Sequence, residues 1–147
     1  MTELNIIIRE FQMADVSYLT DLTNELGYDT TVDQMAERMN CITKLENYWT
    51  FVATTNDRVV GYIGLNKNYF WEQDGYYLRV QALVVNNKFR HLGVGQKLMD
   101  SAEHTAKQIE TKIIILNCGN RDERKYAHKF YAKLGFEPKS TGYVKRL

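Results

Sequence analysis

The fold of this chain is decided by the stretch Val84-Val85-Asn86-Asn87-Lys88-Phe89-Arg90-His91-Leu92-Gly93-Val94-Gly95-Gln96-Lys97-Leu98. It begins at the end of an apolar, β-branched run, and Asn86-Asn87-Lys88 then supplies turn chemistry. Gly93 and Gly95 follow, and apolar residues then recur at spacings of three and four, which predicts a helix. The apolar positions of this helix are Val94, Leu98, Ala102, Ala106 and Ile109. The stretch therefore predicts a strand, a turn and the start of a helix.

A glycine-rich helix start is a natural binding site for an anion. The first N–H groups of a helix have no partner within it, and the helix dipole adds roughly +0.5 charge there. Glycines let a phosphate approach the backbone without a Cβ in the way, and Arg90 adds donors that suit phosphate oxygens. The stretch thus predicts a phosphate or diphosphate cradle. The alternative is a tight strand-to-helix turn in which the glycines serve only the backbone.

Two common phosphate-binding loops do not match this stretch. The dinucleotide fingerprint needs a third glycine three residues after the second, where this chain has Leu98. A Walker A loop needs four residues between its glycines, but one residue separates Gly93 from Gly95, and Gln96 follows.

Composition favours one globular domain over residues 1–147. The hydrophobic fraction is 44%, and the formal net charge of +1 gives no basic surplus that would point to nucleic acid. No apolar run reaches the roughly 18 residues that span a bilayer. The start Met1-Thr2-Glu3-Leu4 lacks the basic residues of a signal peptide, and the two cysteines, Cys41 and Cys118, suggest no disulfide framework. We therefore expect a cytoplasmic protein that binds neither nucleic acid nor membrane.

The rest of the chain predicts an α/β fold with a mixed sheet and helices on both faces. Strands are expected at 5–11, 48–54, 59–65, 76–85 and 112–117, the last one covered on both faces, with short terminal strands at Phe136 and Tyr143-Val144. A first helix is expected from Val16 to Leu26, with Asp15 as its cap and Gly27 as its end, and a second begins after Thr30 or Thr31. The last helix is expected over about 122–134, before Gly135. Within the central strand, Val80, Ala82 and Val84 are expected to share one face.

Carboxylates cluster on the first two predicted helices. They are either solvated helix faces, or one or two of them line the mouth of a substrate pocket and attract a cationic amine. The five residues are Asp21, Glu25, Asp29, Asp33 and Glu37. The predicted loop 66–75 adds Trp71 beside Glu72 and Asp74, a mixture that could hold an ammonium group, form a dimer contact or make a satellite core.

The segment Arg90-His91-Leu92-Gly93-Val94-Gly95 resembles the R/Q-x-x-G-x-G/A signature of the GNAT superfamily of N-acetyltransferases. Gln81–Val85 resembles the strand before this signature, and Leu116–Arg121 resembles the end of the next strand. Arg124–Phe136 resembles the closing helix of the family, with its F-Y-x-x-x-G-F ending. The likeness covers nearly the whole chain and is closest to the small-amine and aminoglycoside branch. It implies a central, twisted, mostly antiparallel mixed sheet and acetyl-CoA as cosubstrate.

The resemblance implies where acetyl-CoA binds. The signature loop would grip its pyrophosphate, and the pantetheine arm would pair with the central strand like an added strand. A free N–H of that strand would polarise the acetyl carbonyl. The positions implied are Leu83, Val84, Val85, Arg90, His91, Leu92, Gly93, Val94, Gly95, Gln96, Asn117 and Arg124. Arg124 stands where the commonest family pattern has asparagine.

The resemblance also implies a catalytic acid. Tyr131 matches the family tyrosine near the thioester sulfur, and a phenol of pKa about 10 is protonated at neutral pH. Gln81 stands where many relatives carry a glutamate, and an amide cannot take a proton. Either water removes the proton from the amine, or Glu25, Glu72 or His128 does.

For the acceptor, the family places its pocket in the region of the first two helices. Glu25 and Tyr28 are therefore expected to bind the substrate, together with Trp71 and Gln81. No metal site is expected, because His91, His104 and His128 have no second ligand at binding spacing.

We thus expect an N-acetyltransferase that moves acetyl from acetyl-CoA directly to the primary amine of a small molecule. Direct transfer is expected because Cys118 has no partner histidine at a recognisable spacing. The alternatives are a protein N-terminal or lysine acetyltransferase, and a degenerate member that senses acyl-CoA without turnover. Gln81 favours the sensor, and Tyr131 opposes it. Many relatives form homodimers, and a homodimer is an open alternative here.

Overall fold

The computed structural model describes residues 4–118, 125–139 and 142–147, and these form two compact units, 1–115 and 116–147. The first unit contains β1 (Ile7–Glu10), η1 (Met13–Asp15), α1 (Val16–Leu26), α2 (Val32–Ile42), β2 (Tyr48–Thr55), β3 (Arg58–Tyr69), β4 (Tyr76–Val85), η2 (Asn87–Phe89) and α3 (Val94–Gln108). The strand β5 (Ile114–Leu116) spans the division between the units, and α4 (Lys125–Lys133) belongs to the second. The expected single domain over 1–147 stays a prediction.

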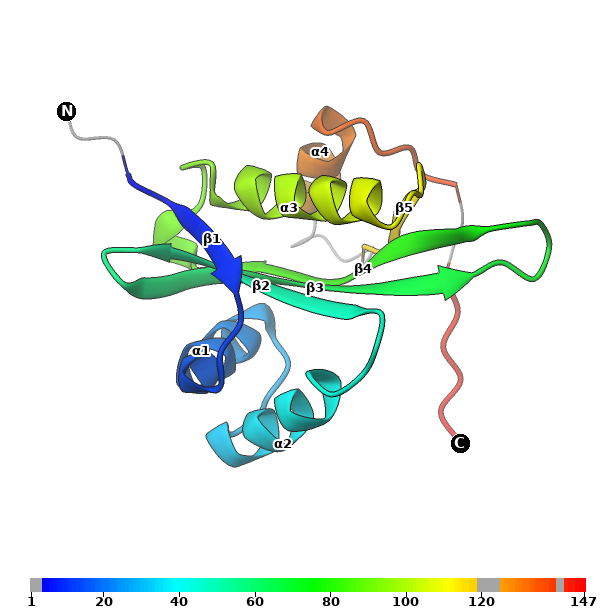
Figure 1. Cartoon of the computed structure of the whole chain (residues 1–147). Helices are drawn as coiled ribbons and strands as arrows, with labels where there is room; N and C mark the ends of the chain where they lie inside the picture. Colours follow the sequence, from blue (N-terminus) through cyan, green and yellow to red (C-terminus); the bar gives the residue numbers. More distant parts are fainter. Residues whose placement is uncertain (1–3, 119–124, 140–141) are drawn as a thin grey trace. The chain divides into compact units, whose positions relative to one another are not determined.

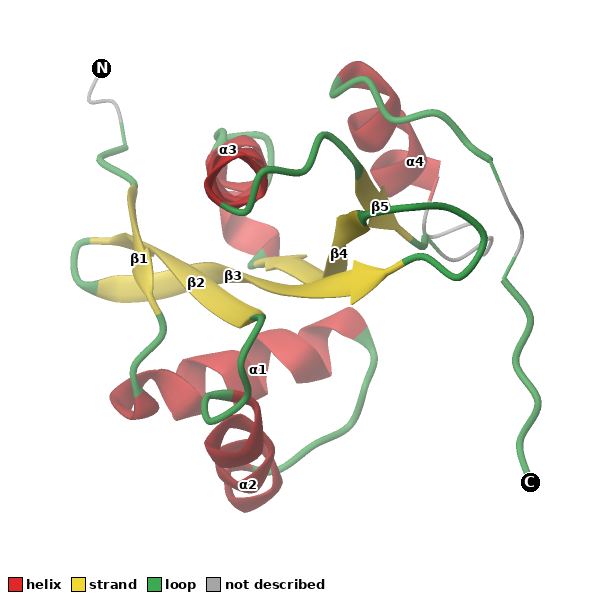
Figure 2. Ribbon diagram, turned by 45° about the vertical axis from the view of Figure 1, so that its right-hand side comes forward, coloured by secondary structure: helices red, strands yellow, loops and turns green. Residues whose placement is uncertain are grey.

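The strands form one sheet in the order β1-β2-β3-β4-β5, and its first three pairs are antiparallel. Figures 1 and 2 show α3 on one face of this sheet and α1 with α2 on the other. This is the predicted α/β architecture.

The β2–β3 hairpin is longer than the sequence predicts. Its turn lies between the predicted strands 48–54 and 59–65, with Asn56 and Asp57 in the left-handed conformation at φ 51° and 61°. The strand β3 does not end at residue 65 but continues to Tyr69, which shortens the expected loop 66–75 to 70–75. Cross-strand contacts explain the extension, because the Lys67 ammonium lies 3.9 Å from the ring centre of Tyr76, and this ring meets that of Tyr69 edge-on.

A β-bulge interrupts the pairing of β3 with β4. Gly64 pairs with Ala82 and Leu65 pairs with Val80, so Gln81 is an extra residue on β4. Because consecutive residues of β3 point to opposite faces, Val80 and Ala82 do so as well. The prediction that Val80 shares a face with Ala82 was therefore wrong, since strict alternation along β4 is broken at Gln81.

Two apolar layers hold the first unit together. The face under α1 and α2 contains a buried cluster that includes Leu19, Leu22, Met35, Met39, Val52, Tyr62 and Val84. The helix α3 buries Val94, Leu98, Met99, Ala102 and Ala106. At Gly61, a Cβ atom would stand 2.9 Å from the Val84 carbonyl oxygen and 3.2 Å from side-chain atoms of both Val94 and Leu98. A glycine at this point of β3 therefore permits the close approach of α3, a role that the sequence did not reveal.

The caps of the first two helices differ from each other. Thr31 caps α2, since its hydroxyl accepts from the Gln34 amide at 3.1 Å while the Gln34 side chain accepts from the Thr31 amide at 3.1 Å. Asp15 precedes α1 as predicted, but its carboxylate makes no cap for that helix. It accepts instead from the Gln12 amide at 2.9 Å and from the Arg9 guanidinium at 2.8 and 2.9 Å. The prediction of an Asp15 cap is thus corrected, because a charged partner on β1 competes for the carboxylate.

Several expectations for the C-terminal part were wrong. The strand β5 has three residues, all half-buried, rather than six residues covered on both faces, and it stands last in the order of the described sheet. In the described segments 136–139 and 142–147, no strand forms at Phe136 or at Tyr143-Val144. Tyr143 is 93% exposed, and its backbone pairs with no strand in the described residues. The helix α4 ends before Gly135 as predicted, and Gly135 has φ +91°. The expected start of this helix, at 122–124, lies outside the described residues.

Candidate active site

The glycine-rich stretch forms an exposed start of α3. Gly93 has φ +89°, a left-handed conformation that favours glycine, and nothing lies within 4 Å of the place where its Cβ would stand. Arg90, His91, Leu92 and Gln96 are exposed around it, whereas Val94 is buried in the core. The helix α3, of 15 residues, thus begins next to open space at Gly93, three residues after the exposed Arg90. These residues fit a phosphate or diphosphate group.

Hydrogen bonds hold the first half of this loop in place. The Asn86 amide donates to the Val60 carbonyl oxygen at 2.8 Å, and the Asn86 side chain accepts from the Lys88 amide at 2.9 Å. The Glu25 carboxylate, at the end of α1, accepts from the Asn87 amide at 2.5 Å. Glu25 therefore links α1 to the loop, and its predicted contact with substrate stays a prediction.

The strand β4 leads into the loop through Leu83, Val84 and Val85. Val84 is buried and the other two are half-buried, and all three pair with β3. At the other end of β4, the Leu78 amide donates to the Ile113 carbonyl oxygen at 3.0 Å. The expected contact of residues 83–85 with a pantetheine arm stays a prediction.

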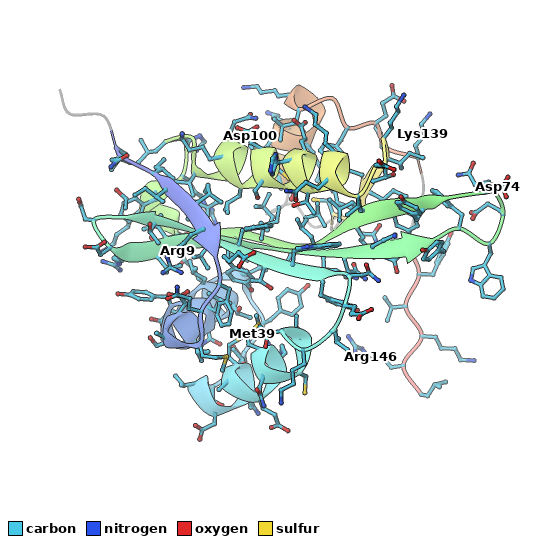
Figure 3. The ribbon with its side chains drawn as sticks, in the orientation of Figure 1. Arg9, Met39, Asp74, Asp100, Lys139 and Arg146 are labelled. Carbon is cyan, nitrogen blue, oxygen red and sulfur yellow. The ribbon has the colours of Figure 1, made fainter. Side chains whose placement is uncertain are left out.

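A cavity of about 210 Å³ lies on the face of the sheet that α1 and α2 cover. Figure 3 shows Met39 of α2 between its helix and the sheet. The apolar lining includes Leu19, Met35, Met39, Ile42, Trp49 and Tyr62, and the polar lining includes Arg38, Thr50 and Gln81. Among the predicted substrate residues, Gln81 alone is in the described lining.

The bulge gives Gln81 a fixed place on the wall of the cavity. Its Nε2 donates to Oδ1 of Asn66 at 3.0 Å, and Asn66 is only 5% exposed. Because this bond uses the amide N–H of Gln81, its Oε1 can accept a hydrogen bond from a bound molecule. The side chain can orient an amine but cannot remove a proton from it.

Tyr62, which belongs to the lining of this cavity, forms a buried hydroxyl pair with Thr23. The Tyr62 and Thr23 hydroxyls lie 2.7 Å apart. Burial raises the pKa of Tyr62, although the Thr23 hydrogen bond and the Arg38 charge act in the opposite direction. Tyr62 therefore stays a neutral phenol at physiological pH.

The other predicted site residues lie elsewhere. Tyr28 is exposed and Trp71 is 101% exposed, and neither lines the described cavity. In the second unit, Tyr131 is half-buried and meets the rings of Phe130 and Phe136 edge-on at 5.5 and 5.9 Å. Asn117 is exposed, and Arg124 lies outside the described residues. The roles expected for these residues stay predictions.

Sequence reasoning missed Arg38, Tyr62 and Asn66. A signal existed for Arg38, which follows Met35 by three residues and thus borders the apolar stripe of α2. No comparable signal marked Tyr62, because it stands within an apolar strand. Asn66 was assigned to a loop, since the length of β3 depends on its pairing with β4.

Comparisons with known proteins agree with this geometry. The model of the acetyltransferase (GNAT) family matches residues 16–136. An aminoalkylphosphonate N-acetyltransferase of Salmonella typhimurium is 29% identical over 126 residues, which cover 86% of this chain and 78% of that protein. A GNAT family acetyltransferase structure from Staphylococcus aureus has a TM-score of 0.82 and 28% identity, and the match covers 98% of this chain and all of that one.

The aminoglycoside N-acetyltransferase AAC(6')-Iy, solved in complex with CoA, has a TM-score of 0.84. It is 16% identical, and the match covers 99% of this chain and 97% of that one, so it shows a shared fold. Over the described residues, none of the helices is both long and apolar enough to cross a bilayer.

Proposed function

This chain belongs to the GNAT family of acetyltransferases, and from that premise we propose that it transfers acetyl from acetyl-CoA directly to the primary amine of a small molecule. The observation that carries the proposal is the cavity beside Gln81. Its volume of about 210 Å³ is below the roughly 300–1,000 Å³ of pockets for drug-sized ligands. A cavity of this size suits a short acceptor. The Salmonella relative, named for aminoalkylphosphonates, supports an acceptor of this kind.

The loop at the start of α3 suits the phosphates of acetyl-CoA. We assign this role to Arg90 and to the backbone from His91 to Gln96, because their N–H groups and charge complement an anion. We assign the pantetheine contacts to the backbone of Leu83–Val85, with further contacts from Asn117 and Arg124. When bound, acetyl-CoA supplies the acetyl group as an activated thioester.

The acceptor amine must be neutral when it attacks the acetyl group. Gln81 is proposed to orient the amine through Oε1, which accepts a hydrogen bond while Nε2 is held by Asn66. Since an amide takes no proton, the proton is proposed to pass from the amine to water, with Glu25, Glu72 and His128 as the alternative bases. Tyr131 is proposed to protonate the departing thiolate, because a phenol keeps its proton at neutral pH.

The proposal is tested by the release of free thiol from acetyl-CoA with a panel of acceptors. The panel contains short amino acids, aminoalkyl phosphonates, polyamines, aminoglycosides and lysine peptides. We expect turnover with a short primary amine and little with aminoglycosides, which exceed the cavity. Turnover with lysine peptides alone would replace the proposal by a protein acceptor, and tight binding of acetyl-CoA with no turnover would replace it by a sensor.

A further inference from the structure

The cavity beside Gln81 has a cationic residue in its lining. Its lining includes Arg38, and no carboxylate occurs among the described residues that line it. None of the five carboxylates that the sequence placed near a substrate mouth is in this lining. A free ammonium compound without an anionic group would therefore meet a positive charge and no negative one.

The charge of Arg38 has no acidic partner among the ion pairs of the described residues. Its guanidinium donates to the Thr30 hydroxyl at 3.4 Å and to the Met35 sulfur at 3.8 Å. Both partners are neutral, and both distances are long compared with the about 2.9 Å that is usual for N–H···O bonds. Most of the hydrogen-bonding capacity of Arg38 is thus available to a ligand, and a planar guanidinium suits a bidentate anion.

Arg38 and Gln81 line different walls of the cavity. Arg38 belongs to α2 on the helical wall, and Gln81 belongs to β4 on the sheet wall. Apolar side chains, among them Met39 and Trp49, line the space between the helices and the sheet. This arrangement suits a molecule with an amine at one end, a short apolar chain and an anion at the other.

We propose that the acceptor is a short aminoalkyl anion, whose carboxylate, sulfonate or phosphonate binds Arg38 while its amine reaches Gln81. This inference rests on the proposed function and names the class of its substrate. Arg38 is then a residue that determines specificity, and it takes no part in proton transfer.

A set of matched amines tests the inference. β-Alanine, taurine and 2-aminoethylphosphonate carry the anion, ethanolamine is neutral and ethylenediamine carries a second cation. We expect a higher kcat/KM, measured by thiol release, for at least one anionic amine than for ethanolamine. In Arg38→Gln we expect the ratio of kcat/KM for the anionic amine to kcat/KM for ethanolamine to fall by about 10- to 100-fold. The change is expected mainly in KM, because hydrogen bonds to a charged group are lost. Arg38→Lys restores part of it, since a lysine keeps the charge without the planar fork.

Two further variants separate a direct contact from a general attraction. Lys44→Gln removes a positive charge just beyond the end of α2, at a residue outside the cavity lining. We expect it to change the preference in kcat/KM for anionic over neutral amines by less than about threefold, because solvent screens a surface charge. Arg79 belongs to β4, opposite Asn66, and its buried Nε has no hydrogen-bond partner in the described structure. A loss of the anionic preference in Arg79→Gln but not in Arg38→Gln would overturn the assignment to Arg38.

The inference can fail separately from the proposed function. Equal kcat/KM for anionic and neutral amines, or an equal loss for all amines in Arg38→Gln, would overturn the inference while the acetyltransferase remains. If no amine releases thiol, the proposed function fails, and calorimetric titration of 2-aminoethylphosphonate and taurine in the presence of CoA decides the inference. Binding that disappears in Arg38→Gln supports the anion site, and no binding to the original protein overturns it.

Discussion

One extra residue in β4 decides which side chains reach the cavity. The bulge at Gln81 places the Gln81 amide on the cavity wall and turns Val80 to the opposite face from Ala82. A regular strand would have sent these side chains elsewhere, because alternation has a period of two. Strand register therefore positions the polar group that is proposed to face the acceptor.

The substitution Gln81→Glu tests how the amine loses its proton. A carboxylate at this point can accept the proton that an amide cannot, and a positioned base contributes typically about 10²–10⁴-fold. We expect kcat/KM at about pH 6 to rise by roughly tenfold or more. Gln81→Met, of similar length but without hydrogen-bonding groups, serves as the control and is expected to give no rise. An unchanged pH profile for Gln81→Glu would show that water suffices.

At Gly61, the absence of a side chain sets the distance between β3 and α3. An added Cβ would meet a backbone carbonyl oxygen at 2.9 Å, which cannot rotate away. We expect Gly61→Ala to lower the free energy of unfolding by about 1–3 kcal/mol, as overpacking does. Urea denaturation provides the measurement.

Gly64→Ala is the matched control, since its Cβ would stand 3.9 Å from that of Ala82, an ordinary contact. It is expected to leave stability unchanged or to raise it by up to about 1 kcal/mol. Equal effects of the two substitutions would contradict the packing argument.

Among the elements, α3 presents the proposed phosphate site. Gly95 is half-buried in its first turn, next to Val94, which anchors the helix in the core. We expect Gly95→Trp to abolish CoA binding in calorimetry, because an indole fills the space beside the first N–H groups. Lys107→Trp, at the exposed far end of the same helix, is expected to bind CoA normally. Undiminished binding by Gly95→Trp would remove the phosphate assignment.

The ion pair between Arg9 and Asp15 joins β1 to the turn before α1. Burial raises the pKa of Asp15, but hydrogen bonds from Arg9 and from the Gln12 amide, with the Arg9 charge, bring the pKa below its usual value. A lowered folded-state pKa means that the ionised carboxylate stabilises the fold above about pH 3.9, the unfolded value. This stabilisation is lost as the pH falls through the folded-state pKa.

We therefore expect Asp15→Asn to cost about 1–3 kcal/mol near neutral pH, in urea denaturation. The difference between Asp15→Asn and the original protein is expected to shrink at acid pH, as the pH falls through the folded-state pKa and the carboxyl becomes protonated in both states. Asp21→Asn, which removes an exposed carboxylate from α1, is the control and is expected to have little effect at either pH. A difference that stays constant with pH would show that packing, rather than charge, is responsible.

At the scale of the whole molecule, the proposed catalytic acid belongs to the second unit. The phosphate loop and the cavity belong to residues 1–115, whereas Tyr131 belongs to residues 116–147. We expect Tyr131→Phe to lower kcat by about 10²-fold or more through loss of the acid, with CoA affinity nearly unchanged. Tyr143→Phe, a highly exposed tyrosine of the same unit, is the control for loss of a phenol. A kcat within about twofold of the original would remove Tyr131 from the mechanism.

Much of the fold was readable because its signals are local. The run from Tyr76 to Val85 predicted β4 with its observed bounds, and Gly27 and Gly135 marked the ends of their helices. The family model confirms the GNAT identity that the Arg90–Gly95 signature indicated. The prediction of terminal strands was wrong because strand formation at a short apolar pair is not a local property. A pair such as Tyr143-Val144 forms a strand only if it can pair with a neighbouring strand.

The amino-acid sequence by itself determined the order of strands and helices, the glycine-rich start of α3 and the family. These features depend on residues that are consecutive or a few positions apart, where periodicity, turns and capping act. Only the tertiary structure decided the bulge at Gln81, the contact at Gly61 and the cavity that Arg38 shares with Gln81. Those features arise from strand register and from helices that pack onto a sheet, and both bring together residues far apart in the chain.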